Sequence, residues 1–443
     1  MSATIDRLPE ISRAGVVVPW FTPSDRPSQA RLTETTGLAE ALGCELGFVQ
    51  AEQIRRVSSS HLLSAGILER VAGVIADKGI NLFIVDGTLT PVQQRNLETK
   101  LGMKVIDRTG LILEIFGLRA RTREGKLQVE LARQLYERSR LVRTWTHLER
   151  QRGGSGFLSG PGETQLESDK RMLDTKVRRL REDLEDVRRT RGLQRDGRRK
   201  SGTPVIALVG YTNSGKSTLF NRISGADVMA KDMPFATLDP TIRRVEIAKV
   251  GPVALVDTVG FITDLPTHLI ESFQATLEEA LEADLLLHVR DRSSPDDHLQ
   301  KRDVEIVLNA LESNAGQALP PMIEVWNKSD RFDAGLAADM AIKAEANQPH
   351  PATLVSALTG GGMEALEGAI AAALKMGDIR GKLVLKPADG AARGWLHEYA
   401  DVLDEQPDPE SGDMRMRVSF TLAQLGSFQS QFPAIGLDTE IPD

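Results

Sequence analysis

Gly210-Tyr211-Thr212-Asn213-Ser214-Gly215-Lys216-Ser217 is the stretch that decides the fold of this chain. It has the Gly-x-x-x-x-Gly-Lys-Ser pattern of a phosphate-binding loop, and its neighbours fit that pattern. The apolar run 204–209 before it predicts a buried strand, and residues 217–223 after it predict the first turns of a helix. Backbone N–H groups of such a loop cradle phosphates, and the helix N-terminus adds partial positive charge. We therefore predict that all eight residues bind a nucleotide, with Lys216 on its outer phosphates and the Ser217 hydroxyl on Mg²⁺.

A second motif, Asp257-Thr258-Val259-Gly260, follows the apolar run 252–256. The run predicts a strand, so Asp257 stands at its tip, where a carboxylate can hold Mg²⁺ through water. The N–H of Gly260 can meet the γ-phosphate. All four residues are assigned to the nucleotide site, and Lys216 and Gly260 are also assigned to catalysis.

Two further motifs identify the base. Asn327-Lys328-Ser329-Asp330 closes the apolar run 321–326. The Asp330 carboxylate can accept from both N1–H and the exocyclic amino group of guanine, whereas adenine would leave it unpaired. The stem of Lys328 can lie along the base. Ser356-Ala357 is expected to offer a backbone N–H to the guanine carbonyl, with Leu358 beside it, so the four motifs together predict a guanine-nucleotide site.

The segment Phe235-Ala236-Thr237-Leu238-Asp239 lies between the first two motifs and is also assigned to the nucleotide site. A GTP-dependent switch needs a hydroxyl that reaches Mg²⁺ only when the γ-phosphate is present. Thr237 and Thr241 are both candidates for this catalytic and metal-binding role. Either threonine can instead open the strand predicted from Ile242 to Lys249.

Composition indicates a cytoplasmic protein of about three domains. Hydrophobic residues make up 41% and charged residues 26% of the 443-residue chain, as in ordinary globular proteins. The single cysteine, Cys44, excludes an intramolecular disulfide and fits a reducing compartment. We find no signal peptide and no apolar run of the roughly 20 residues that a membrane span needs. We expect a monomer.

Charge is distributed unevenly along the chain. The net charge is −7, yet residues 119–200 hold 23 Lys and Arg against 13 Asp and Glu, a local excess of +10. The rest of the chain therefore carries −17. A basic arm on an acidic protein suits a phosphate-rich partner such as RNA. The alternative is a solvated helix with balanced ion pairs, which the acidic pairs Glu182-Asp183 and Glu185-Asp186 partly support.

The pattern of segments predicts an α/β protein with four parts. Residues 1–118 alternate strands and helices, which predicts a parallel α/β domain. Residues 119–200 predict a long basic helical hairpin, with a glycine-rich tip at 153–162 and a polar linker from residue 192. Residues 201–375 predict a P-loop GTPase domain with a mixed, mostly parallel sheet of six strands. Residues 376–443 predict a small α+β domain with a helix at 394–403 and an acidic loop at 404–413.

The whole chain resembles the HflX family of ribosome-associated GTPases. The resemblance rests on several segments besides the phosphate loop: 95–98, 105–109, 124–132, 160–167, 235–239 and 257–261. It implies that Thr237, rather than Thr241, is the switch threonine on Mg²⁺. It also implies that the hairpin reaches the peptidyl-transferase region of the large ribosomal subunit and that the protein splits stalled ribosomes under stress. The chain departs from the family at Phe157-Leu158-Ser159, where many members have an arginine.

Phe261 follows Gly260, at the place where Ras-like GTPases have the glutamine that orients water. A phenyl ring cannot make that hydrogen bond, so we expect slow intrinsic hydrolysis that ribosomes stimulate. Two alternatives remain open on the residues alone. One is a signalling GTPase with a non-ribosomal partner, and the other is an RNA remodeller that acts through its arginine-rich arm. The tip at 153–162 is correspondingly either a connector or a probe whose glycines allow close approach to a partner.

Overall fold

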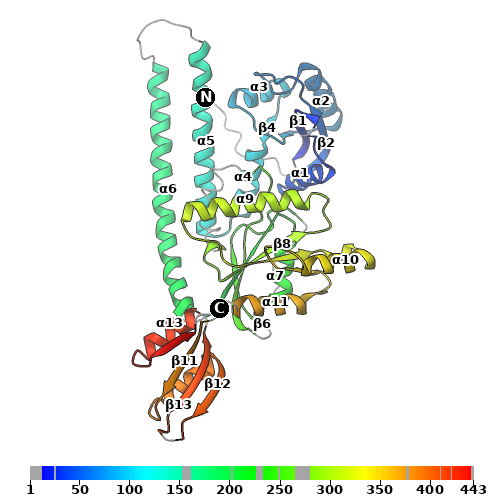
Figure 1. Ribbon diagram of the computed structural model, residues 1–443. Helices are drawn as coiled ribbons and strands as arrows, with labels where there is room; N and C mark the ends of the chain where they lie inside the picture. Colours follow the sequence, from blue (N-terminus) through cyan, green and yellow to red (C-terminus); the bar gives the residue numbers. More distant parts are fainter. Residues whose placement is uncertain are drawn as a thin grey trace.

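The structure is a computed structural model that describes most of the chain. The described residues are 12–23, 26–151, 161–200, 203–225, 233–247, 250–264, 280–375, 379–409, 411–420 and 422–440. The predicted tip at 153–162 lies outside them, except for its last two residues. Figure 1 shows two packed α/β units, a long helical hairpin along one flank and a small sheet at one end.

The first unit is a four-stranded parallel sheet in the order β2-β1-β3-β4, as its alternating patterns predict. Val16, Val17 and Ile84 are completely buried, because helices cover both faces of such a sheet. Gly79 ends α2 in the left-handed conformation that glycine adopts without strain. The elements are β1 (Arg13–Trp20), α1 (Gln29–Ala41), β2 (Glu45–Gln53), α2 (Ala65–Lys78), β3 (Leu82–Val85), α3 (Pro91–Leu101), β4 (Lys104–Asp107) and α4 (Arg108–Arg119).

The hairpin consists of α5 (Arg123–Gln151) and α6 (Pro161–Lys200), which lie side by side (Figure 1). Their facing sides bury a small apolar cluster: Leu131, Leu135, Val177, Leu180 and Leu184. The polar linker predicted from residue 192 is wrong, since α6 continues to Lys200. Each glycine lowers the stability of a helix by only about 1 kcal/mol, and the surrounding helix-favouring residues offset this loss. No helix in the described part of the chain, these two included, is long and apolar enough to cross a membrane.

The second unit has a six-stranded sheet in the order β10-β9-β8-β5-β7-β6. Only β6 and β7 pair in antiparallel fashion, which confirms the predicted mixed, mostly parallel sheet. The strands are β5 (Val205–Val209), β6 (Thr241–Ile247), β7 (Gly251–Asp257), β8 (Leu285–Asp291), β9 (Met322–Asn327) and β10 (Ala352–Leu354). The described helices are α7 (Lys216–Ser224), α9 (Asp297–Ala315), α10 (Ala334–Glu345) and α11 (Met363–Lys375).

The two α/β units share one hydrophobic core. A single buried cluster contains Leu38 and Phe116 from the first unit together with Phe235, Phe261 and Leu286 from the second. The sharing follows from α1 and α4, which turn apolar residues toward the second unit. The switch segment, residues 235–239, therefore packs against the first unit as well as its own sheet.

The C-terminal part is a four-stranded antiparallel sheet in the order β12-β13-β11-β14. The acidic loop predicted at 404–413 is partly wrong, because 401–407 form a strand in which Asp404 lies opposite Arg417. Opposite charges across a strand pair favour the ladder. The helix predicted at 394–403 ends at Tyr399. The elements are β11 (Ile379–Leu385), α12 (Gly390–Tyr399), β12 (Asp401–Pro407), β13 (Met414–Phe420), α13 (Leu422–Gln431) and β14 (Leu437–Glu440).

Candidate functional site

A pocket opens at the carboxyl ends of β5 and β9, where α/β sheets bind ligands. Residues from all four predicted motifs and from the switch segment line it. They are Thr212, Asn213, Gly215, Lys216, Ser217, Thr218, Met233, Phe235, Ala236, Thr237, Gly260, Asn327, Lys328, Asp330, Arg331, Ala357 and Leu358. Sequence reasoning missed Thr218, Met233 and Arg331. Each adjoins a predicted motif, so extending the motifs by a residue or two finds them.

Two glycines give the phosphate loop its shape. Gly210 has a φ of 150°, and a Cβ there would lie 2.2 Å from the carbonyl oxygen of Val289. Gly215 has a φ of 97°, and a Cβ there would lie 2.1 Å from Nδ2 of Asn327. A side chain at Gly210 would collide with the backbone of β8, and one at Gly215 would collide with the side chain of Asn327. The loop therefore delivers Lys216 to the first position of α7.

Lys216 is buried beneath the loop. Its Nζ donates to the carbonyl oxygens of Gly210 at 3.0 Å and Tyr211 at 2.8 Å. Burial lowers the pKa of Lys216 to about 8, and the charge of Asp257 acts in the opposite direction. The amine is thus a desolvated cation donor that can exchange carbonyl oxygens for phosphate oxygens.

Asp257, Ser217 and Thr237 form a cluster of oxygen atoms at the tip of β7. Oδ2 of Asp257 accepts from both hydroxyls at 2.8 Å, and the two hydroxyl oxygens are 2.9 Å apart. Oδ1 of Asp257 is buried and has no hydrogen-bond partner within the described structure. Burial raises the pKa of Asp257, while Lys216 and the two hydroxyls oppose the shift. Hard oxygen ligands with one unsatisfied carboxylate oxygen fit Mg²⁺.

Thr241 does not join this cluster. It is the first residue of β6, opposite Asp257 in the ladder between β6 and β7. Of the two threonines that sequence reasoning left open, the structure brings only Thr237 to Ser217.

Asn327 and Asp330 hold the base end of the pocket together. Nδ2 of Asn327 donates to the carbonyl of Ser214 at 2.8 Å, and its Oδ1 accepts from the N–H of Ala357 at 3.0 Å. Asp330 accepts from the hydroxyl of Ser356 at 2.5 Å. The Nζ of Lys328 lies 2.8 Å from Asp291 at the end of β8. These contacts fix the loop after β9 against the phosphate loop.

The predicted N–H donor to the guanine carbonyl needs a correction. The N–H of Ser356 donates to the carbonyl of Gly361 at 2.9 Å, and that of Ala357 donates to Asn327. The first group is occupied because the loop closes on itself, and the second because the side chain at the end of β9 reaches the loop. Leu358, the third residue of the predicted set, lines the pocket.

The loop after β7 lies directly on the phosphate loop. The N–H of Thr212 donates to the carbonyl of Phe261 at 2.6 Å, and the N–H of Phe261 donates to the carbonyl of Gly210 at 3.1 Å. Gly260 lines the pocket, and Thr258 donates its hydroxyl to the carbonyl of Leu208 at 2.6 Å. Val259 and the ring of Phe261 are buried in the shared core, so neither side chain faces the pocket.

Asp239 and Leu238 depart from the predicted set. Leu238 is buried in the shared core. The Asp239 carboxylate turns away from the pocket to the start of α5, where Oδ2 accepts from the N–H groups of Arg121 at 2.9 Å and Thr122 at 3.0 Å. Its assignment to the nucleotide is therefore wrong for the side chain, because unpaired N–H groups at a helix start attract a carboxylate. Likewise Ser329 does not line the pocket, and its N–H donates to Val355.

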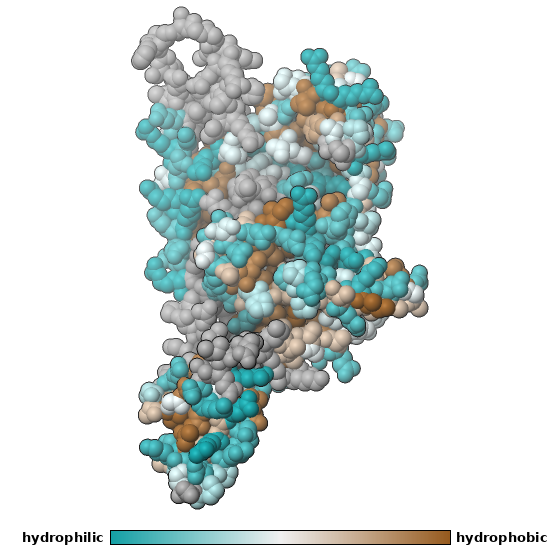
Figure 2. Space-filling view, viewed as in Figure 1, coloured by the Kyte–Doolittle hydropathy of each residue, from teal (hydrophilic) through white to brown (hydrophobic). Residues whose placement is uncertain are grey.

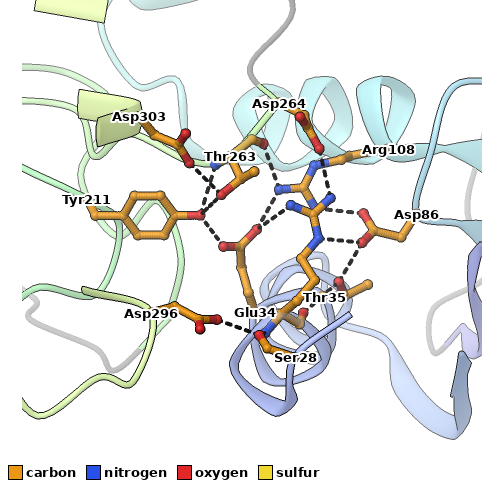
Figure 3. A network of polar contacts seen from close by, with 11 residues as sticks. Ser28, Glu34, Thr35, Asp86, Arg108, Tyr211, Thr263, Asp264, Asp296 and Asp303 are labelled. Atoms are coloured by element: carbon orange, nitrogen blue, oxygen red, sulfur yellow. Dashed lines mark hydrogen bonds and ion pairs between the residues drawn. The ribbon is translucent and has the colours of Figure 1, made fainter. Parts of the chain in front are cut away.

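Tyr211 also points away from the pocket, into a polar network between the two α/β units (Figure 3). Its hydroxyl contacts Glu34 of α1 and accepts from the N–H of Thr263 at 2.8 Å. Burial, followed by the charge of Glu34, raises the pKa of Tyr211 above its usual range. The tyrosine therefore joins the phosphate loop to the loop after β7 and to the first unit.

Arginines of the first unit complete the network. Arg108 binds Asp86 at 2.6 Å and donates to the carbonyl of Thr263 at 2.9 Å. Arg31 reaches both Asp86 at 3.0 Å and Asp264 at 3.2 Å. Sequence reasoning assigned none of these residues, and charged residues in a helix or after a strand carry no signal for such a role.

Family models match three consecutive parts of the chain. "GTP-binding GTPase N-terminal" matches residues 29–117, "GTP-binding GTPase Middle Region" matches 119–198, and "50S ribosome-binding GTPase" matches 205–328. A crystal structure of a GTP-binding protein from the archaeon Sulfolobus solfataricus with GDP has a TM-score of 0.45 and 24% identity. It covers 82% of this chain and 98% of its own.

Curated relatives match over most of their length. GTPase HflX of Magnetococcus marinus is 42% identical over 414 residues, which are 93% of each chain. GTPase HflX of Escherichia coli is 40% identical over 407 residues, covering 91% of this chain and 93% of its own. The chain therefore belongs to the GTPase HflX family, and it binds and hydrolyses GTP.

Proposed function

We propose that this GTPase binds the large ribosomal subunit in its GTP state and splits or rescues stalled ribosomes under stress. The observation that carries the proposal is the hairpin, which lies along the flank of the GTPase unit (Figure 1). Its helices have 29 and 40 residues. At about 1.5 Å per residue, arms of roughly 30 residues extend about 45 Å, which suits a probe that enters a cavity lined with RNA.

The described surface of α6 presents basic residues to a partner such as RNA, among acidic residues of the hairpin that pair with Arg171, Lys176 and Arg189. Figure 2 shows mostly hydrophilic side chains along the described part of the hairpin. Its exposed basic residues are Lys170, Arg171, Lys176, Arg178, Arg179, Arg181 and Arg189. Such side chains bind phosphates with an affinity that falls as salt rises. The family description of a 50S ribosome-binding GTPase agrees with this partner.

The proposed roles in the pocket follow from its geometry. Ser217, Thr237 and Asp257 would hold Mg²⁺, and the ion would supply positive charge against the phosphates. Lys216 and the N–H groups of the loop bind the phosphates, and the N–H of Gly260 meets the γ-phosphate. Asp330 accepts the two N–H groups of guanine. Because the buried ring of Phe261 cannot orient water, intrinsic hydrolysis is slow and the ribosome stimulates it.

Co-sedimentation with separated ribosomal subunits tests the proposal. The protein is expected to pellet with the large subunit in a one-to-one ratio with a non-hydrolysable GTP analogue, and much less with GDP. Turnover should rise when ribosomes are added. Equal pelleting in both nucleotides contradicts the proposal, and nucleotide-independent unwinding of naked RNA would indicate an RNA remodeller. We also propose that the protein acts in the cytoplasm as a monomer.

A further inference from the structure

We infer that Asp239 couples the GTP site to the hairpin by joining the switch segment to the start of α5. It is a positioning residue, since its carboxylate does not face the nucleotide pocket. The inference rests on the proposed role of Thr237 and adds how the nucleotide state reaches the hairpin.

The start of α5 is capped from two sides. Thr122 is the residue before the helix, and its hydroxyl oxygen accepts from the N–H of Gly125 at 2.9 Å. The same hydroxyl donates to Oδ1 of Asp239, whose Oδ2 accepts from the N–H groups of Arg121 and Thr122. A carboxylate at this place satisfies donors that the helix itself cannot pair, and it meets the positive end of the helix dipole.

The contact is close enough to require a glycine. A Cβ on Gly125 would lie 2.2 Å from Oδ1 of Asp239. Alanine raises the equilibrium constant for helix formation about fivefold relative to glycine. Helix formation alone therefore does not explain why this position is a glycine. Gly125 therefore makes room for Asp239.

The middle of the switch segment, by contrast, lines the nucleotide pocket. Thr237, two residues before Asp239, bonds to Ser217 and Asp257 in the pocket. Leu238 between them is buried, with 3% of its surface exposed. Phe235 packs edge-on against Phe116 of α4, with ring centroids 4.6 Å apart. This short segment thus contacts Ser217 and Asp257 through Thr237, and the hairpin through Asp239.

Coupling between two sites is reciprocal. A nucleotide that holds Thr237 in place also holds Asp239 on α5. Conversely, a partner that displaces the hairpin displaces Asp239 and, with it, the neighbouring Thr237. GTP binding and hairpin orientation therefore stabilise each other through Asp239.

Two variants break the contact in different ways, and both are compared with wild type without ribosomes. Asp239→Ala removes the carboxylate. Gly125→Ala keeps the carboxylate but displaces it from the start of α5, and it also raises the helix propensity of α5. The first readout is the release rate of a fluorescent GTP analogue as a function of Mg²⁺ concentration. The second is the distance distribution between spin labels on Met172→Cys of the hairpin and Ile342→Cys of α10, in a Cys44→Ala background. Both label sites are exposed.

Both variants are expected to release the analogue about fivefold faster at limiting Mg²⁺, the order expected for loss of one helix cap. The label distances should differ between GDP and the analogue in wild type, and this difference should disappear in both variants. Thr90→Ala is the control, because it removes the cap of a different helix, α3. Circular dichroism confirms that each variant is folded.

Wild-type release and label distances in either Asp239→Ala or Gly125→Ala would overturn the inference. Thr237→Ala separates this outcome from failure of the proposed function. If Thr237→Ala abolishes the Mg²⁺ dependence while the other two variants release the analogue like wild type, only the coupling is wrong. If Thr237→Ala retains that dependence, the proposed metal role is wrong as well.

Discussion

The hydroxyl of Tyr211 accepts a hydrogen bond of 2.8 Å from the backbone N–H of Thr263. Tyr211 belongs to the phosphate loop, and Thr263 belongs to the loop that follows β7 and carries Gly260. The same tyrosine hydroxyl contacts Glu34 of α1 (Figure 3). One side chain therefore links the nucleotide site, the loop that would sense the γ-phosphate, and the N-terminal unit.

Tyr211→Phe should loosen the loop after β7. The change deletes one hydroxyl and leaves the ring, so it removes the contacts with Glu34 and Thr263, of which the bond from the Thr263 N–H contributes about 1 kcal/mol. Amide hydrogen exchange of peptides that contain residues 258–264 is expected to be about fivefold faster. Tyr136→Phe is the matched control, because its hydroxyl donates to Asp107 in the N-terminal unit. Equal exchange in wild type and Tyr211→Phe would show that the bond does not hold this loop.

Asp330→Asn should weaken GTP binding by about 2 kcal/mol or more, because an amide cannot accept both N–H groups of guanine. Xanthine carries an acceptor in place of the guanine amino group, so the variant should prefer XTP. Titration with fluorescent GTP and XTP analogues measures both affinities. Asp333→Asn is the control, since Asp333 caps α10 and asparagine caps equally well. Unchanged GTP affinity in Asp330→Asn would refute the assignment of this residue.

Lys216→Ala and Ser217→Ala should each abolish nucleotide-dependent binding to the large subunit. The first removes the buried amine beneath the phosphate loop, and the second removes a hydroxyl of the proposed metal cluster. Neither should unfold the protein, because removing a buried amine also removes its desolvation penalty. Turnover, co-sedimentation and thermal unfolding are measured together. Wild-type turnover in either variant contradicts its proposed catalytic role.

Replacing residues 153–162 by a short turn should leave basal GTP hydrolysis nearly unchanged and abolish ribosome splitting. The tip joins α5 to α6 and has no proposed contact with the nucleotide. Stimulation of hydrolysis by ribosomes should also weaken. Light scattering of intact ribosomes reports splitting, and phosphate release reports hydrolysis. If the variant splits ribosomes normally, the tip is only a connector.

His288 should make the protein less stable in mild acid. It is buried in β8, its Nδ1 has no hydrogen-bond partner among the described residues, and burial lowers its pKa from 6.5 to about 3. Because the folded state favours the neutral imidazole, His288 makes its full contribution to the free energy of unfolding above pH 6.5. This contribution is lost as the pH falls from 6.5 toward 3. The loss has a slope of up to about 1.4 kcal/mol per pH unit.

His288→Leu should flatten this slope, which denaturant unfolding between pH 7 and about pH 5 measures. Exposed His397 provides the control, as His397→Gln makes a comparable change at the surface. A slope that is equal in wild type and His288→Leu would show that other groups cause the acid sensitivity.

The sequence alone determined the class of fold and the nucleotide motifs, because both depend on short stretches. A phosphate loop needs Gly210 and Gly215 for local backbone reasons, and apolar runs ending in Asp257 and Asn327 predict strands whose ends meet at one edge of a parallel sheet. Even the antiparallel pair of β6 and β7 follows from two strand-like runs joined by a short turn.

Only the tertiary structure decided which way several motif side chains point. Asp239 caps a helix that begins more than a hundred residues earlier, and Tyr211 meets Glu34 across the boundary between two units. The N–H of Ala357 pairs with Asn327, and α6 runs on through the predicted linker. In the first three cases the partner is distant in sequence, so no local pattern contains it. A polar group pairs with whatever donor or acceptor the packed chain brings to it.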